Sequence, residues 1–168
     1  MIQFKIKPFN KLSTTELYEL LQLRSEVFVV EQNCVYQDID GKDEKALHVL
    51  GYFNDELAAY SRLFDKGYYF EEASIGRVVV SPKYRDKKFG HDLMRVSIAA
   101  IKESFNQTAI TISAQEYLKK ICLLGKQTDL QRTPFQFLLL QNFSCIKIKQ
   151  NNSYPLTSTI ASFRSSFE

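Results

Sequence analysis

The chain has 168 residues, a net charge of +3 and three cysteines, so it is long enough for one domain with its own core. Its 45% hydrophobic and 24% charged residues are typical of a soluble protein, and no run of about 18 apolar residues could cross a membrane. The N-terminal segment MIQFKIKPFN alternates apolar and basic residues, unlike a signal peptide. Cys34, Cys122 and Cys145 form no CxxC pair and no even set, which indicates reduced thiols in a cytoplasmic protein.

The charge is unevenly distributed along the chain. Residues 1–116 carry 15 basic and 17 acidic side chains, whereas residues 117–168 carry 7 basic and 2 acidic ones. A basic tail can indicate a nucleic-acid partner. The basic residues here are scattered and form no RNA-binding motif, so we expect no nucleic acid partner. The sequence leaves the oligomeric state open, a homodimer included.

The first predicted elements are a strand and an amphipathic helix. Residues 2–7 alternate apolar and polar side chains, which predicts a strand that ends at Pro8. Ser13 and Glu16 have the spacing of a capping box, so a helix should begin directly after Ser13. This helix is predicted to place four apolar side chains on one face: Leu17, Leu20, Leu21 and Phe28.

Arg24 falls on the same apolar face, where a cation must be paired or point into a cavity. One interpretation is a structural ion pair with an aspartate further along the chain. The candidates for this pair are Asp38, Asp40 and Asp43. The other interpretation is an anchor for an acidic group of a bound substrate. We favour the structural pair and keep the substrate contact as the alternative.

A meander of three strands is predicted next. His48 to Phe53 and Leu57 to Phe64 should be strands joined through Asn54-Asp55, a two-residue hairpin signal. Ile75 to Val80 is apolar at consecutive positions, which predicts a central strand. The preceding residues 31–43 are too polar for a core and indicate a shaped loop near a site.

From Gly90 the spacing becomes helical. The apolar side chains that define this helix are Met94, Ile98, Ile101 and Phe105. Ala109 to Ser113 is a short apolar run and predicts a buried strand. A strand, a helix and a second strand in succession predict a right-handed parallel crossover. The expected fold class is therefore α/β, a mixed sheet with helices on both faces.

The segment from Arg77 to Leu93, RVVVSPKYRDKKFGHDL, carries the most information about function. A β-branched run ends at Ser81-Pro82, and a basic turn then leads to Gly90 at the start of the predicted helix. The N-terminus of a helix has unpaired N–H groups and a partial positive charge, which together favour phosphate. The alternative is an ordinary strand–loop–helix junction with a solvated basic turn. These residues alone do not decide between the two.

The spacing of Arg85 and Gly90 resembles the acetyl-CoA loop of GNAT acyltransferases, usually Arg/Gln-x-x-Gly-x-Gly/Ala. The segment LRSEVFVVEQNCVYQDIDGKD, residues 23–43, is similar to the signature of the ElaA-type branch of that superfamily. Later segments that share the resemblance are His48, AYSRL (residues 59–63), IGRVVV (residues 75–80) and SAQ (residues 113–115). The resemblance covers about residues 2–118. It implies a mostly antiparallel mixed sheet with a central splayed parallel pair, and acetyl transfer from acetyl-CoA to an amine.

The resemblance also implies where the cosubstrate would bind. The strand residues Val78, Val79 and Val80 would offer backbone groups to the pantetheine arm and the thioester. The loop that would wrap the pyrophosphate comprises Arg85, Asp86, Lys87, Lys88, Phe89 and Gly90. No metal is implied. The acceptor amine is not specified by the sequence.

Direct acetyl transfer needs a base to deprotonate the amine, and two residues are candidates. Glu31 lies in the signature loop and could act through a water, and His48 at a strand start has a suitable pKa. Either could equally be a solvated polar residue. Expected hydrogen-bonding partners of the acceptor are Gln32, Tyr36 and Gln115, with Arg24 as the alternative anchor named above. Arg62 and Arg77 lie within predicted strands, and one interpretation is that they pair with acids on neighbouring strands.

The chain departs from the family pattern at two places. Lys88 occupies the first-glycine position of the pyrophosphate loop, at a cost of about 1–2 kcal/mol if the backbone there needs positive φ. Cys122 falls where the family's tyrosine, the usual acid for the departing thiolate, should stand. The runner-up function is therefore an acyl-CoA-binding protein with little or no catalytic activity.

The chain is expected to form a single domain over residues 1–168, with an atypical segment at residues 119–168. The match to the family ends abruptly after Lys119-Lys120, and a frameshifted tail is one interpretation. It predicts that the tail is the least regular part and that residues 151–168 are loosest. In the other interpretation, Phe135 to Leu140 and Ile146 to Lys149 form a hairpin that replaces the family's terminal one.

Overall fold

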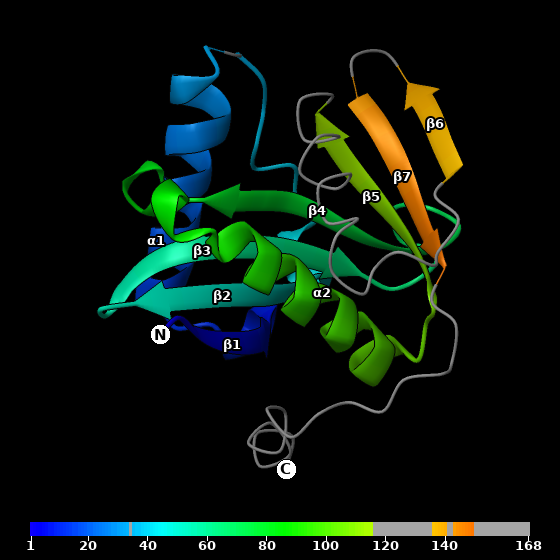
Figure 1. Cartoon of the computed structure of the whole chain (residues 1–168), viewed down its shortest axis with the longest axis horizontal. Helices are drawn as coiled ribbons and strands as arrows, with labels where there is room; N and C mark the ends of the chain where they lie inside the picture. The colour runs from blue at the N-terminus through cyan, green and yellow to red at the C-terminus, as the bar shows by residue number, and fades with distance from the viewer. Residues whose placement is uncertain (34, 116–135, 141–142, 150–168) are drawn as a thin grey trace.

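The structure is a computed structural model that describes residues 1–33, 35–115, 136–140 and 143–149, with the backbone alone from residue 113 onward. These residues form one seven-stranded sheet in the order β1-β2-β3-β4-β5-β7-β6 (Figure 1). The strands are β1 (Gln3–Pro8), β2 (Leu47–Phe53), β3 (Glu56–Phe64), β4 (Ala73–Val80), β5 (Ala109–Gln115), β6 (Gln136–Leu140) and β7 (Phe143–Lys149). The helices are α1 (Thr14–Arg24) and α2 (Phe89–Phe105), with short helical turns η1 (Phe9–Lys11), η2 (Ser25–Glu31), η3 (Asp43–Lys45) and η4 (Pro82–Lys87).

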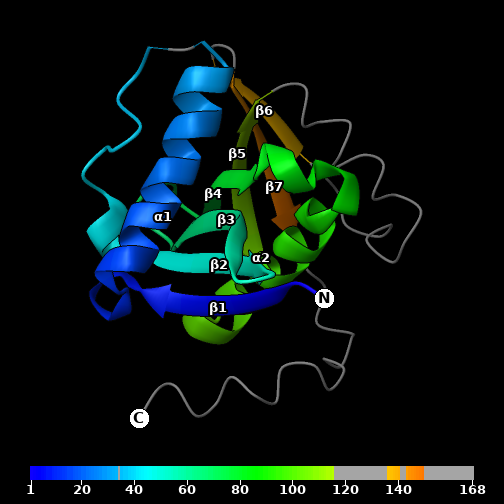
Figure 2. The same ribbon diagram turned by 90° about the vertical axis from the view of Figure 1, so that its left-hand side faces the viewer.

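The two long helices lie on opposite faces of the sheet (Figure 2). Leu63 of β3 packs in one buried cluster with Leu93 and Ile101 of α2. Tyr60 of the same strand packs in a second cluster with Leu20 of α1. Because successive side chains of a strand point to opposite faces, this alternation buries both faces of the sheet at once. The prediction of a mixed sheet with helices on both faces is confirmed. In the described part of the chain, no helix combines the length and apolarity that a membrane span requires.

The N-terminal elements form as the sequence predicts. The Ser13 hydroxyl accepts a hydrogen bond from the Glu16 N–H at 3.1 Å, and the Glu16 carboxylate accepts one from the Ser13 N–H at 2.9 Å. The Lys7 ammonium also binds this carboxylate at 2.8 Å, which joins β1 to the start of α1. After Arg24 the helix widens into η2, a π-helical turn that the sequence does not signal. Such turns often occur at functional sites.

The predicted meander is also present. Asn54 and Asp55 have φ angles of 51° and 62°, which are the two positive values of a type I′ hairpin turn. The strand predicted from Ile75 begins at Ala73 and lies between β3 and β5, so its central position is confirmed. The crossover through α2 brings β4 and β5 together in parallel, as the strand–helix–strand pattern predicts.

The last two strands bear on the two interpretations of residues 119–168. β6 and β7 form an antiparallel hairpin, and β7 pairs along the whole of β5, from Ala109 opposite Lys149 to Gln115 opposite Phe143. This is the arrangement that the replacement-hairpin interpretation predicts. Cys122 and residues 151–168, on which the other expectations depend, lie outside the described residues. A frameshifted origin of residues 119–168 stays a hypothesis.

Candidate functional site

The central parallel pair of strands is joined over only part of its length. Residues Ala73 to Ile75 of β4 pair with Ile110 to Ile112 of β5. β4 then continues to Val80 and β5 to Gln115 without further pairing between them in the described structure, and the two strands diverge (Figure 1). Strand edges that face no neighbour carry N–H and C=O groups that a ligand can bind.

β4 carries a bulge at the point of divergence. Arg62 of β3 lies opposite Gly76, and Tyr60 lies opposite Val79, so Arg77 and Val78 together face Ser61. Arg77 has a φ of 52° in the left-handed region. For a residue other than glycine this conformation costs about 1–2 kcal/mol. The sequence predicts the strand here but not the bulge.

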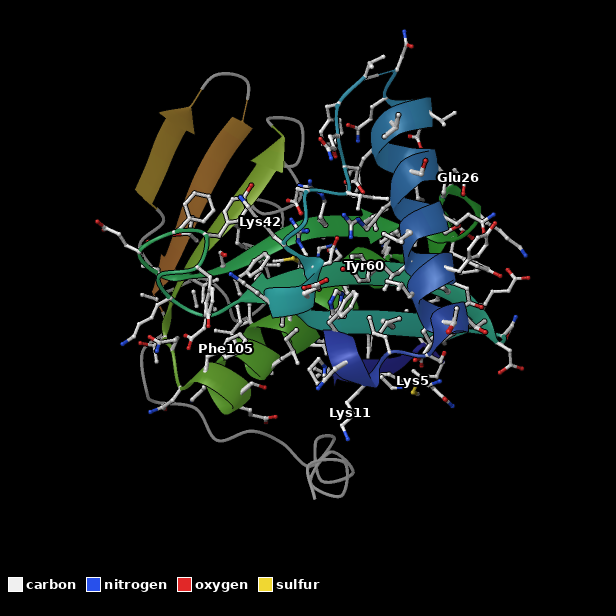
Figure 3. The ribbon with its side chains drawn as sticks, turned by 180° about the vertical axis from the view of Figure 1, so that it is seen from behind. Lys5, Lys11, Glu26, Lys42, Tyr60 and Phe105 are labelled. Carbon is white, nitrogen blue, oxygen red and sulfur yellow. The ribbon has the colours of Figure 1, made fainter. Side chains whose placement is uncertain are left out.

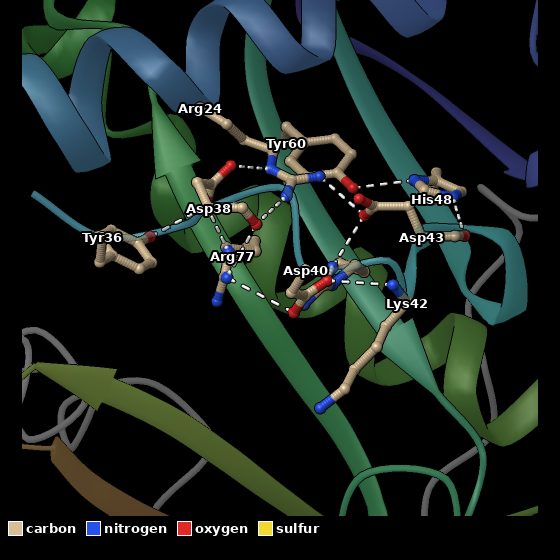
Figure 4. A network of polar contacts seen from close by, with 10 residues as sticks. Arg24, Tyr36, Asp38, Asp40, Lys42, Asp43, His48, Tyr60 and Arg77 are labelled. Atoms are coloured by element: carbon tan, nitrogen blue, oxygen red, sulfur yellow. Dashed lines mark hydrogen bonds and ion pairs between the residues drawn. The ribbon is translucent and has the colours of Figure 1, made fainter.

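Arg24 is fully buried and bonds to the loop that covers the sheet (Figure 4). Its Nε donates to Asp38 Oδ2 at 2.8 Å, Nη1 donates to Asp43 Oδ1 at 2.7 Å, and Nη2 donates to the Asp38 carbonyl at 2.9 Å. The structural ion pair favoured from the sequence is therefore confirmed. The alternative, an anchor for an acidic group of a substrate, would require such a group to displace an aspartate from a buried position.

Two further arginines bind the same loop. Arg62 donates to both carboxylate oxygens of Asp40 at 2.7 Å and to Asp43 Oδ1 at 2.8 Å. Arg77 Nε donates to Asp38 Oδ1 at 2.6 Å. We call these six residues the arginine–aspartate network: Arg24, Arg62, Arg77, Asp38, Asp40 and Asp43. The expectation that Arg62 and Arg77 pair with cross-strand acids needs correction, because their partners are loop aspartates.

The network keeps two of its aspartates, Asp40 and Asp43, ionised. Burial alone would raise the pKa of Asp40, but the hydrogen bond and charge of Arg62 outweigh it and lower this pKa to about 2. Burial likewise opposes ionisation of Asp43, and the charges of Arg24 and Arg62 lower its pKa nonetheless. Each carboxylate is thus held by two or more donors, so the network fixes the loop to α1, β3 and β4.

His48, a predicted base, lies in the core beneath this network. It is fully buried on β2, with Nδ1 2.8 Å from the Tyr60 hydroxyl and Nε2 3.0 Å from the Asp43 carbonyl oxygen. Burial lowers the pKa of its imidazole. Seen from the α1 side, Tyr60 lies on the sheet beside the helix (Figure 3). With both ring nitrogens bonded inside the protein, His48 has the contacts of a structural histidine.

Glu31, the other predicted base, lies beside the predicted pyrophosphate loop. Its two carboxylate oxygens accept hydrogen bonds from Arg85 Nη1 at 2.8 Å and Nη2 at 2.6 Å. Both side chains are about half exposed, at 41% for Glu31 and 48% for Arg85. The hydrogen bond from Arg85 lowers the pKa of Glu31, so its carboxylate is charged at neutral pH. No local sequence pattern indicates this contact, because the two residues are 54 positions apart in the chain.

The predicted pyrophosphate loop spans η4 and the first turn of α2. Lys88, the N-cap of α2, has φ 60° and ψ 24°, so the backbone at the family's first-glycine position does need positive φ. Gly90 follows in the first helical turn, and a Cβ there would lie 3.7 Å from Val80 Cγ2 at the end of β4. The side chains of Arg85 and Lys87 are exposed, whereas Phe89 is buried with its ring 5.1 Å from that of Phe53.

The loop is also held at its start. The Tyr84 hydroxyl donates to Glu56 at 2.6 Å, and the Lys83 ammonium binds the same carboxylate. Asp86, another predicted loop residue, forms an ion pair with Lys87 at 3.0 Å. The contacts of Lys83 and Tyr84 with Glu56 connect η4 to β3, so the N-terminus of α2 has a fixed position beside the end of β4.

Val78, Val79 and Val80 are the predicted pantetheine contacts. Val79 is 3% exposed and packs on the α1 side, whereas Val78 and Val80 are partly buried against the α2-side cluster. Val78 lies in the bulge and Val79 and Val80 follow it, and all three are on the part of β4 that no longer pairs with β5. Their backbone edge therefore faces the divergence of the strands.

The three residues expected to bind the acceptor lie in three different parts of the fold. The Tyr36 hydroxyl donates to Asp38 Oδ1 at 3.0 Å, and its ring centre lies 5.6 Å from the Arg77 guanidinium. Burial raises the pKa of Tyr36 to about 12, although Arg77 opposes this. Gln32 ends η2 and is half-buried. Gln115 ends β5, and only its backbone is described. Tyr36 thus contacts the network directly.

The geometry can accommodate an extended ligand with an anionic end. A basic loop and a helix N-terminus at the end of β4 favour phosphate. The edge of β4 beyond Ile75, which pairs with no strand on this side in the described structure, offers backbone hydrogen bonds. Among the described residues, no group of three His, Cys, Asp or Glu side chains is placed to hold a metal ion.

Comparison with known proteins agrees with this geometry. A profile of the family described as acetyltransferase (GNAT) domain matches residues 13–121. The protein ElaA of Escherichia coli (strain K12) is 42% identical over 121 residues, which are 71% of this chain and 79% of ElaA. These are the superfamily and the branch that the sequence motifs resemble.

Solved structures show the same similarity. The crystal structure of Escherichia coli ElaA superposes with a TM-score of 0.75 at 33% identity and covers 89% of this chain and 100% of its own. An acyl-CoA N-acyltransferase from Pseudomonas aeruginosa superposes with a TM-score of 0.74 at 33% identity, and the match covers 88% of this chain and 99% of that one. The superpositions thus extend beyond the part of the chain that carries the sequence motifs.

Proposed function

The chain belongs to the GNAT acetyltransferase family, and we propose that it is an N-acyltransferase that transfers an acetyl group from acetyl-CoA to an amine acceptor. The observation that supports acetyl-CoA most directly is the divergence of β4 and β5 beside the N-terminus of α2. In this proposal the pyrophosphate lies against residues 85–90, and the pantetheine arm follows Val78 to Val80. The cysteine pattern of the sequence is consistent with a cytoplasmic location, which is part of the proposal.

The proposed reaction is a direct transfer. The acceptor nitrogen attacks the thioester carbonyl carbon, a C–N bond forms, the C–S bond breaks, and the electron pair leaves with the CoA sulfur. The proton lost by the amine passes to a base. Glu31 and His48 are the two candidates, and Glu31 is the one with access to solvent. A charged, half-exposed carboxylate could take the proton through a water.

A protein that binds acyl-CoA with little or no turnover is the second candidate function. It is favoured by Cys122 at the position of the family's tyrosine, the usual acid for the departing thiolate. Loss of a positioned acid typically slows a reaction about 10²–10⁴-fold. Steady release of free CoA from acetyl-CoA in the presence of a primary amine separates the two candidates, since only the transferase produces it.

We expect CoA to stabilise the folded protein. A ligand at about 100 times its dissociation constant should add about 2.7 kcal/mol to the free energy of unfolding. A thermal melt with increasing CoA measures this, with adenosine as a control that lacks the pyrophosphate and the pantetheine arm. A melting temperature that does not respond to millimolar CoA would remove both candidate functions.

Glu31→Gln should separate two roles that the position of Glu31 allows: acceptance of the proton from the amine, and an ion pair with Arg85 of the proposed pyrophosphate loop. If Glu31 accepts the proton, turnover should fall about 100-fold and lose its acidic limb. Because the variant also frees Arg85 from a carboxylate, CoA should bind up to about fivefold more tightly, the value of one exposed ion pair. Kinetics and calorimetric titration measure the two effects.

The matched control for this variant is Glu26→Gln, which removes an exposed carboxylate from the same helical turn. It should change neither turnover nor CoA affinity. Unchanged turnover in Glu31→Gln would exclude Glu31 as the base, whatever the effect on CoA binding.

A further inference from the structure

Arg77 combines two features that are rarely found together. It has a positive φ, and it lies inside a strand. The other described residues with positive φ, glycines aside, lie outside the strands: Asn33, Asn54, Asp55, Lys88 and Asn106. Four of these are Asn or Asp, which tolerate the left-handed region. A strained residue in a strand persists only when its surroundings hold it there.

The contacts that hold Arg77 come from the arginine–aspartate network. Its Nε donates to Asp38 Oδ1 at 2.6 Å and its Nη2 to the Asp38 carbonyl at 3.1 Å. The same Asp38 is bound by Arg24, which is fully buried, and by the Tyr36 hydroxyl. The guanidinium therefore binds one residue at two points, and that residue is itself fixed to α1.

This arrangement connects the proposed binding site of the acetyl donor with that of the acceptor. The backbone of Arg77 forms the bulge from which β4 diverges, directly before the proposed pantetheine contacts. Its side chain holds the loop that carries Tyr36, an expected contact of the acceptor. A shift of the loop would move Arg77, and a change in the bulge would move the start of the pantetheine edge.

We propose that Arg77 is a positioning residue, which through its two-point contact with Asp38 aligns the donor thioester with the acceptor. This inference rests on the proposed acetyl transfer. Displacement of reacting groups by about 1 Å can cost 10²-fold in rate. The affinity for CoA itself should depend little on Arg77, because the proposed pyrophosphate contacts lie at residues 85–90 on a separately anchored loop.

Three substitutions separate the effect of the Arg77 side chain from the effect of its strained backbone. Arg77→Gly removes the guanidinium and accepts the positive φ without strain. Arg77→Ala removes the guanidinium and keeps the strain. Arg77→Lys keeps the charge but cannot make the two-point contact. If the side chain matters through position, Gly and Ala should show the same functional loss, although Ala should be the less stable of the two.

The first readout is turnover of acetyl-CoA with the fastest of three amines: spermidine, phenethylamine and an alanine tripeptide. We expect Arg77→Gly and Arg77→Ala to lower kcat by about 10- to 100-fold, with CoA affinity within about twofold of the native protein. Arg77→Lys should recover part of the loss. Millimolar methylguanidinium should restore part of the turnover of Arg77→Gly, which a merely structural defect would not show.

The second readout needs no turnover. Titration with CoA and with an acetyl-CoA analogue that carries CH₂ in place of the thioester sulfur compares affinities with and without the acetyl group. The native protein should prefer the acetylated ligand, and Arg77→Gly should lose this preference while it keeps its affinity for CoA.

The inference is overturned if Arg77→Gly matches the native protein in both readouts, or if the native protein shows no preference for the acetyl group. It is also overturned if the variant loses affinity for CoA as strongly as for the analogue, since the effect would then lie in donor binding. A native protein that does not bind CoA would instead remove the proposed function itself, and the inference with it.

Discussion

Replacing Gly90 by valine should lower the affinity for CoA about 100-fold and leave the stability of the free protein nearly unchanged. A Cβ at this position would make only an ordinary contact, 3.7 Å from Val80 Cγ2, so the folded chain has room for a side chain. The two branches of valine would extend toward the end of β4, where the proposed pyrophosphate approaches the first turn of α2. Loss of about two hydrogen bonds to a charged group, at about 1.5 kcal/mol each, the low end of the usual range, gives roughly this factor.

Gly90→Ala is the matched control for this prediction. The family pattern to which Gly90 corresponds accepts either glycine or alanine, so this variant should still bind CoA. It should also be more stable by about 0.5–1 kcal/mol, because alanine favours the helix over the unfolded chain. Calorimetric titration and thermal melts measure both variants. Tight CoA binding by the valine variant would show that the pyrophosphate lies elsewhere.

Local signals account for the elements that the sequence predicts well. The capping box of Ser13 and Glu16 and the turn at Asn54-Asp55 act over a few residues, and both form as expected. The apolar run at the end of β4 identifies a central strand because both faces of that strand are covered. Periodicity and turn residues are sufficient for these elements, since the side chains that decide them are close in sequence.

The site depends on contacts that no local pattern encodes. The Arg24 partners lie 14 and 19 residues away, and Asp38 lies 39 residues from Arg77. Which aspartate meets which arginine depends on the path of the loop over the sheet. The sequence therefore predicts that a buried arginine needs a carboxylate partner. It does not predict that three arginines and three aspartates alternate in one network.

The backbone conformation at the site is a second feature that the sequence does not predict. The sequence identifies Lys88 as a departure from glycine only by comparison with a family pattern, and the structure gives it φ 60°. Nothing in the sequence indicates the bulge at Arg77. Arginine has no preference for positive φ, so its conformation follows from the long-range contacts of its side chain rather than from its identity.

The network should matter more for stability than any other polar contact described in this chain. Replacing Arg24 by methionine should lower the free energy of unfolding by about 3–5 kcal/mol, since it leaves Asp38 and Asp43 buried without their shared cation. Urea denaturation at neutral pH measures this loss. The control is Arg95→Met, which removes an ion pair with Asp92 whose arginine is 77% exposed, and it should change stability by no more than about 0.5 kcal/mol.

The pH dependence of stability provides the sharper test of the same prediction. The pKa of Asp43 is lowered in the folded protein, so this carboxylate stabilises the fold above its unfolded pKa, and the contribution is lost as the pH falls through the folded value. Without Arg24 the charge that opposes burial is weaker, so the folded pKa should rise. Acid unfolding of Arg24→Met should therefore begin at higher pH than that of the native protein. If both proteins lose stability over the same acid range, the charge of Arg24 does not hold Asp43 ionised. Packing of the side chains, rather than their charge, would then account for the contribution of the network to stability.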